Sequence, residues 1–172
     1  GSSPGDHFTV ANIGNSVRTW SDGGEPIVSG SVLYPVLETD PEAVFVVGHT
    51  DCGAVTAAYE WEQSSQAPDR DELRSELELV RRHVADGLEL LDLESHDKPA
   101  TLARLAEFNV DRQVATLAEA VDEVPVVGAV CDLHEQYSDR RGGVHLVNYD
   151  DATEANDVPT ELATYHNRLT AP

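Results

Sequence analysis

The stretch AVFVVGHTDCGAV, residues 43–55, decides the fold. It opens with an unbroken apolar run rich in β-branched side chains, which is typical of a strand buried on both faces, as in a parallel sheet. A polar turn between Gly48 and Gly53 follows, and residues 54–61 have the composition of a helix. Proteins of the α/β class place their ligands where such a strand passes into a helix. The stretch therefore predicts an α/β fold with a site in this turn.

The segments downstream extend the same pattern. Residues 71–91 and 102–121 each carry apolar side chains on one helical face, and Lys98-Pro99 is predicted to break the chain between them. Residues 124–133 and 144–147 predict two further strands, with Gly142-Gly143 as a hairpin turn. Strands that alternate with helices predict one domain, residues 1–172, built on a mainly parallel β-sheet flanked by helices.

The segments upstream and at the C-terminal end are less regular. Residues 8–13 form a short β-prone run, and a polar, glycine-rich stretch follows over residues 15–25. Residues 27–38 have a helical apolar face that Pro35 should kink or shorten. Residues 148–172 are polar and predict at most one short helix.

The charge balance excludes several classes of partner. The chain has 32 Asp and Glu against 11 Lys and Arg, a formal net charge of −21, and Lys98 is its one lysine. Such a surface repels nucleic acid and anionic membranes. There is no apolar run long enough to span a membrane and no secretion signal, which predicts a cytoplasmic protein. Since molar salt screens self-repulsion, the composition also favours a halophilic protein over an ordinary acidic one.

Cysteine usage points to one candidate metal motif. Cys52 and Cys131 are too few for a disulfide framework. His49-x-x-Cys52 joins an imidazole and a thiol across the turn, and zinc binds both donor types. On spacing alone, a strand-end histidine beside a small buried cysteine is the more common explanation. A Cys nucleophile with His as its base is a third, less favoured interpretation, because such close neighbours rarely meet in the required geometry.

The residues around the motif resemble β-class carbonic anhydrases. GHTDCGAV, residues 48–55, looks like the second zinc-binding signature of that family, in which His and Cys are ligands. PGDHFTVANIGN (residues 4–15), NVDRQVATL (109–117), VVGAVCDLHEQY (126–137) and GGVHLVNYD (142–150) are similar to further family segments, in the family's order. The resemblance covers residues 4–150.

This resemblance implies zinc-dependent, reversible hydration of CO2 to bicarbonate, with zinc hydroxide as the nucleophile. It implies His49 and Cys52 as zinc ligands, and a homodimer or higher homo-oligomer with cleft residues from both subunits. The family's other zinc motif, Cys-x-Asp-x-Arg, lies before the PGD segment, where only Gly1-Ser2-Ser3 stands here. We therefore expect an N-terminally incomplete domain in which no catalytic residue can be named. The alternative is a non-catalytic homologue that binds a small anion or a partner subunit.

Other residues have weaker claims to the site. A Cys131-x-x-His134 pair could complete a Cys2His2 set, but a buried strand thiol and a solvent-facing histidine are the favoured interpretation. Asp51 is expected to serve the turn, and His83 and His96 are expected to be solvated. The resemblance adds Asn12, Gly14 and Asn15 as cleft residues. For His7, a proton-shuttling place near the site is the alternative to surface placement, which is the favoured interpretation.

Overall fold

The computed structural model describes residues 7–121 and 123–169. In this part of the chain no helix is long and apolar enough to cross a membrane. The elements, in chain order, are η1 (Ile13–Asn15), β1 (Arg18–Trp20), β2 (Pro26–Val28), α1 (Gly30–Thr39), β3 (Val44–His49), α2 (Gly53–Ser64), α3 (Asp71–Leu90), α4 (Lys98–Ala118), β4 (Val126–Asp132), β5 (Gly143–Tyr149) and η2 (Ala163–Tyr165). The predicted α/β class is confirmed.

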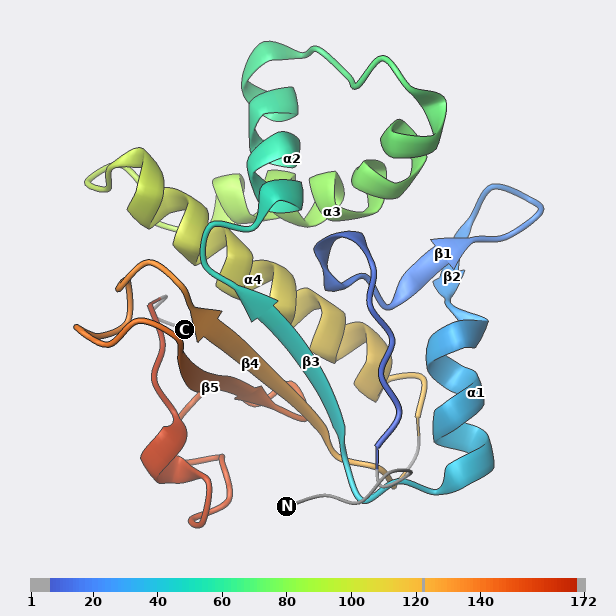
Figure 1. The fold of residues 1–172 in the computed structure, drawn as a ribbon, viewed down its shortest axis with the longest axis vertical. Coiled ribbons are helices and arrows are strands. Elements are labelled where there is room, and N and C mark those ends of the chain that lie inside the picture. Colours follow the sequence, from blue (N-terminus) through green and yellow to red (C-terminus); the bar gives the residue numbers. More distant parts are fainter. Residues whose placement is uncertain (1–6, 122, 170–172) are drawn as a thin grey trace.

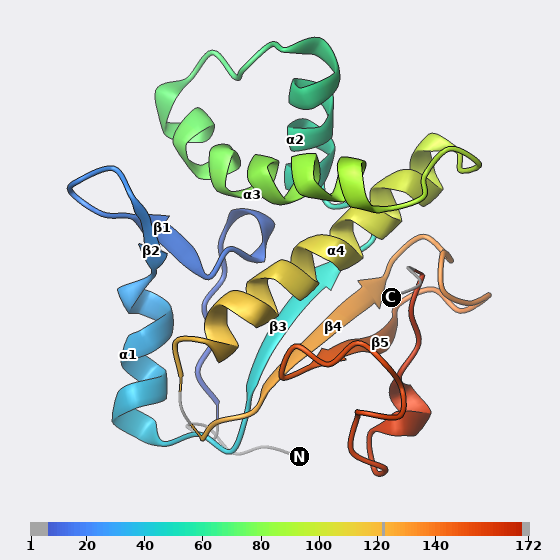
Figure 2. The same ribbon diagram turned by 180° about the vertical axis from the view of Figure 1, so that it is seen from behind.

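The sheet at the centre of the fold is small and mixed. Its order is β3-β4-β5, with β3 parallel to β4 and β5 antiparallel to β4 (Figure 1). Seen from behind, α4 runs along one face of this sheet (Figure 2). Gly48 and Gly128 allow this approach, since a Cβ at either position would meet Val110 of α4 at 2.6 and 2.9 Å.

Two apolar clusters meet at α4. Val110, Val114 and Leu117 pack against the sheet strands, and all three are fully buried. Leu105 lies in a second cluster with side chains of α2 and α3. Helix α4 therefore packs between the sheet on one side and helices α2 and α3 on the other.

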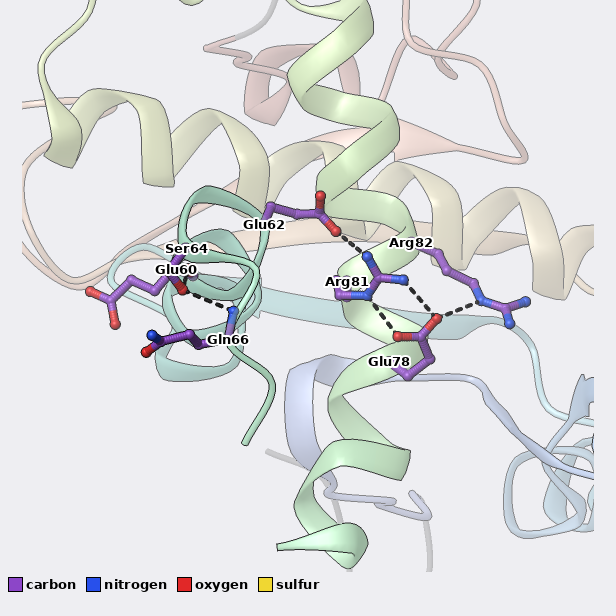
Figure 3. A network of polar contacts seen from close by, with 7 residues as sticks. All are labelled: Glu60, Glu62, Ser64, Gln66, Glu78, Arg81 and Arg82. Atoms are coloured by element: carbon purple, nitrogen blue, oxygen red, sulfur yellow. Dashed lines mark hydrogen bonds and ion pairs between the residues drawn. The ribbon is translucent and has the colours of Figure 1, made fainter. Parts of the chain in front are cut away.

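Ion pairs fasten α2 to α3. Arg81 of α3 contacts Glu62 of α2, and its Nε lies 2.6 Å from Glu78 on its own helix (Figure 3). The same guanidinium lies 4.9 Å from the ring centroid of Trp61. Glu78 also pairs with Arg82 at 3.4 Å. Because these groups are only partly exposed, the network is better shielded from solvent than an ordinary surface pair.

Strand β3 differs from the prediction in one respect that matters for the site. The strand is present, but only the side chains facing α4 are well covered. Phe45 is 64% exposed and Val47 is 51% exposed, on the opposite face. No helix covers that face over β3 (Figure 1), and among the described residues no strand pairs with the outer edge of β3. The expectation of burial on both faces was therefore wrong.

Several predicted boundaries were also wrong. Residues 8–12 have no regular structure in place of a strand, and the polar stretch after them contributes to the β1–β2 hairpin, with Trp20 opposite Pro26. Helix α1 starts later than expected and continues past Pro35 to Thr39. Lys98-Pro99 begins α4, because Asp97 caps the helix and proline is tolerated in the first turn.

The C-terminal segment is tied to α4 through buried charges. Arg168 lies 2.7 Å from Asp111 and 3.3 Å from Glu107, which is fully buried. Tyr137 donates its hydroxyl to Glu107 at 2.6 Å. Burial raises the pKa of Tyr137 and also that of Asp111, although Arg168 opposes the rise at the carboxyl. The chain end is therefore held against the same helix that supports the sheet.

Candidate functional site

His49 and Cys52 line one pocket at the carboxyl end of β3. The pocket has a volume of about 210 Å³ and is also lined by Val47 and by residues of the segment 10–15. His49 is the last residue of β3, and Cys52 is the N-cap of α2. The strand-turn-helix sequence places both donors as predicted, and whether they bind a metal remains a prediction.

The orientation of His49 follows from strand geometry. Side chains alternate along a strand, so His49 lies on the same open face as Phe45 and Val47. Its Nδ1 lies 3.0 Å from the carbonyl oxygen of Thr50, which can only accept a hydrogen bond. In the neutral imidazole Nδ1 therefore carries the proton, and Nε2 has a lone pair for a ligand.

A buried carboxylate fixes the turn that follows His49. Thr50 donates its hydroxyl to Asp132 at 3.3 Å and accepts the backbone N–H of Leu133 at 2.8 Å. Asp132 also accepts backbone N–H groups from residues 134, 136, 137 and 138. Burial alone would raise the pKa of Asp132, but these donors together lower it below its ordinary value. The ends of β3 and β4 are thus locked side by side.

The second wall of the pocket is held from α4. Asn109, which is 1% exposed, donates its amide to the carbonyl of Gly14 at 3.0 Å and to Asn15 Oδ1 at 3.3 Å. Gln113 accepts the backbone N–H of Val17 at 2.9 Å. Asn15 Nδ2 is a buried donor with no hydrogen-bond partner among the described residues. A buried donor of this kind requires an acceptor, which a water molecule, a ligand or a further chain segment can supply.

His83 belongs to this support and is not solvated. It is 6% exposed, and its Nδ1 lies 2.9 Å from Asn109 Oδ1. Burial lowers its pKa. Its sequence position carried the signal, since His83 follows Leu79 and Val80 at helical spacing on the apolar face of α3. The charged residues around His83 led to the expectation of a solvated side chain, which was wrong.

The remaining candidates do not complete a metal site. Cys131 is the register partner of His49 across β3 and β4, and it is a free, partly buried thiol. His134 is exposed and lies 3.5 Å from Asp51. In the described part of the chain, no three or more His, Cys, Asp or Glu residues group so as to hold a metal ion. His7 is exposed, and His96 lies at a different groove.

The pocket thus offers two side chains that can bind zinc, which is fewer than the three or four protein ligands found in zinc sites. Asn12, Gly14 and Asn15 line it together with Val10, Ala11 and Val47. The three apolar residues in this wall, and Asn109 and Gln113 behind it, are additions that the sequence did not single out. The apolar wall suits a small, uncharged ligand.

Comparison with solved structures finds β-carbonic anhydrases among the similar chains. One of two tetrameric enzymes from the filamentous ascomycete Sordaria macrospora is 24% identical with a TM-score of 0.57, over 76% of this chain and 65% of that chain. CafA of the fungal pathogen Aspergillus fumigatus is 22% identical with a TM-score of 0.61, over 96% and 74%. CcaA is 17% identical with a TM-score of 0.55, over 86% and 65%. At these identities the similarity establishes the fold, and the chain spans less than two thirds of the first of these proteins.

Comparison with curated proteins found no match. A family model described as carbonic anhydrase matches residues 1–137, well over half of the chain. Together with the shared β-class fold, this match means that the chain belongs to the β-class carbonic anhydrase family.

Proposed function

We propose that this protein takes part in the reversible hydration of CO2 to bicarbonate at a zinc site to which His49 and Cys52 contribute two ligands. The observation that carries the proposal is the pocket that these two donors share with an apolar wall. Zinc, when bound, supplies Lewis-acid activation of water. An imidazole nitrogen and a thiolate sulfur fit this ion, and the hydrogen bond from His49 Nδ1 to Thr50 is the kind of support that orients a ligating histidine.

The chain's own residues have distinct roles in this proposal. Val10, Ala11 and Val47 provide the apolar surface against which CO2 binds. Asn109 and Gln113 form hydrogen bonds to the segment that carries Val10 and Ala11. Asp132, at the end of the neighbouring strand β4, accepts a hydrogen bond from Thr50 in the turn between the two ligands.

We propose further that a strand bearing Cys-x-Asp-x-Arg completes the site by pairing with the outer edge of β3. The edge has no partner strand among the described residues, and Phe45 and Val47 expose apolar surface beside it. Residues 7–12 run along the same side of β3 without pairing with it (Figures 1 and 2). An open edge with apolar neighbours favours the addition of a strand.

Metal binding tests the ligand assignment. Zinc per chain is measured by elemental analysis after purification in molar salt, and Co²⁺ is titrated while the thiolate-to-cobalt charge-transfer absorption is followed. In the protein that includes the completing strand, we expect metal binding that is lost in Cys52→Ala and weakened in His49→Ala. Cys131→Ala is the matched control, since Cys131 is the other free cysteine, and it should retain the metal.

Two results would contradict the assignment. A folded protein that includes the completing strand and takes up no metal would favour the non-catalytic homologue, and loss of metal in Cys131→Ala would mean that the ligand set is wrong. CO2 hydration by the zinc-loaded protein, followed by stopped flow with a pH indicator, then tests the activity separately. Bound zinc without hydration would retain the ligands and reject the reaction.

A further inference from the structure

A second and larger cavity lies away from the zinc pocket, between the end of α3, one face of α4 and the C-terminal segment. Its volume is about 650 Å³. Arg104, Phe108 and Arg112 line it from α4 at successive helical turns. Leu90 and His96 line it from the end of α3 and the loop that follows. None of these residues lines the pocket of His49 and Cys52.

The cations of this groove are unusual for so acidic a chain. Carboxylates outnumber cations by 32 to 11, yet Arg104 forms no ion pair or hydrogen bond with any described residue. Arg112 reaches Asp86 only at 3.9 Å, with both side chains about half exposed. Arg104 and Arg112 lie eight residues apart on α4, which is about two helical turns. Their guanidinium groups keep most of their hydrogen-bonding capacity for another partner.

Of the three carboxylates that line the groove, one is paired with Arg168 and two are exposed. Arg168, whose side chain is 9% exposed, pairs with the lining carboxylate of Asp111 at 2.7 Å and also with the buried Glu107 at 3.3 Å. The two other lining carboxylates, Asp92 and Asp151, are exposed to solvent, where water and salt screen them. His96 adds a buried Nδ1 that has no hydrogen-bond partner among the described residues.

The rest of the lining is apolar. Leu91, Phe108 and Leu169 contribute to the wall, and Leu90 stands at the groove with 72% of its surface exposed. A groove that joins Arg104, unpaired among the described residues, and the weakly paired Arg112 to exposed apolar side chains matches a ligand with a carboxylate at one end and a hydrocarbon body. Guanidinium groups bind carboxylates through paired, charge-assisted hydrogen bonds.

We propose that this groove is a binding site for an organic carboxylate with an apolar body, whose carboxylate contacts Arg104 and Arg112. The hydrocarbon part lies against Phe108 and Leu90. The site does not use the zinc pocket, so it stands or falls independently of the proposed CO2 hydration.

The probe is 4-phenylbutyrate, titrated into the ¹⁵N-labelled protein at fixed salt concentration, with 4-phenyl-1-butanol as its uncharged counterpart. We expect saturable shifts of backbone amides around residues 104–112. Arg104→Gln should weaken binding about tenfold, as expected for loss of a charge-assisted hydrogen bond. Arg112→Gln is the second variant and should act in the same direction.

Arg70→Gln is the matched control. It removes the same charge from the N-cap of α3, at the opposite end of the helix from Leu90, and should leave the affinity unchanged. Thermal melting of each variant establishes that it is folded. The proposal is overturned if 4-phenylbutyrate gives no saturable shifts, if Arg104→Gln and Arg70→Gln bind it equally, or if the alcohol binds as well as the carboxylate.

Discussion

At the scale of single residues, buried polar groups do most to position the candidate site. Asp132 and Thr50 are both fully buried and hold the turn after His49. Asn109 and His83 are buried behind the opposite wall. Each is satisfied by named partners, so the removal of one leaves the others buried and unpaired, which costs more than the hydrogen bond itself contributes.

Asp132 gives the first prediction. Its pKa is lowered in the folded state by backbone donors, so its contribution to stability is present above the unfolded pKa, about 3.9, and is lost as the pH falls through the lower folded value. Asp132→Asn should lower the free energy of unfolding by about 2 kcal/mol at pH 7. Urea denaturation at several pH values should show this difference shrink below about pH 4.

Asp139→Asn is the control for that measurement, because Asp139 is exposed in the same loop. It should change the unfolding free energy by less than about 0.5 kcal/mol. Equal effects of the two substitutions would contradict a special role for Asp132.

His83 gives the second prediction, with a different pH range. Burial lowers its folded pKa below the ordinary value of about 6.5, so the unfolded state takes up the proton first as the pH falls. The stability that neutral His83 contributes is therefore present above about pH 6.5 and is lost as the pH falls through the folded value. In His83→Gln, this part of the slope of unfolding free energy between pH 7.5 and 5 should disappear. His134→Gln, which removes an exposed histidine, should keep it.

At the scale of elements, the sequence predicted those whose signals are local. The apolar run before His49 predicted β3, composition predicted α2, and helical spacing predicted α3 nearly at its observed bounds. Helical spacing also predicted α4, but as residues 102–121 in place of Lys98–Ala118. Residues 8–13 are just as β-prone, yet they form no strand, because a strand requires a partner and pairing is decided by distant parts of the chain. For the same reason the run correctly predicted a strand at Phe45 but wrongly predicted that both of its faces are buried.

In the candidate site, too, the sequence predicted the residues that are close together in the chain and missed the contacts between distant ones. His49 and Cys52 are three positions apart, so the sequence alone could place them together. Asn109 and Gly14 are joined by a hydrogen bond across 95 positions, which no local pattern reveals. The family resemblance brought Asn15 near the cleft, but only the fold identifies its amide as a buried donor without a partner among the described residues.

The open face of β3 gives the third prediction. Phe45 exposes 64% of its surface next to an unpaired strand edge, which favours self-association of the chain. Phe45→Thr should weaken this association about tenfold, as measured by sedimentation velocity over a range of concentrations. Tyr165→Thr is the matched control, because Tyr165 is also 64% exposed but lies outside the sheet. An unchanged association constant in Phe45→Thr would mean that the chain associates through another surface.

At the scale of the whole molecule, the net charge of −21 dominates. The few cations are concentrated in specific contacts, such as Arg81 between α2 and α3 and Arg168 against α4. These contacts leave most carboxylates without a cation, so the folded state concentrates like charges that the unfolded chain spreads apart. The stability of the fold therefore depends on the solvent as well as on its contacts.

This repulsion gives the fourth prediction. At pH 7, raising KCl from 0.1 M to 2 M shortens the screening length from about 10 Å to a few ångströms and should raise the free energy of unfolding by a few kcal/mol. Salt could also act by strengthening apolar burial, and the isoelectric point of about 4.4 separates the two causes. Near that pH the net charge is close to zero, so an electrostatic benefit of KCl should nearly vanish, whereas a benefit from apolar burial should persist. Denaturation curves at both pH values decide the matter, and an equal gain at pH 7 and pH 4.4 would reject charge repulsion as the cause.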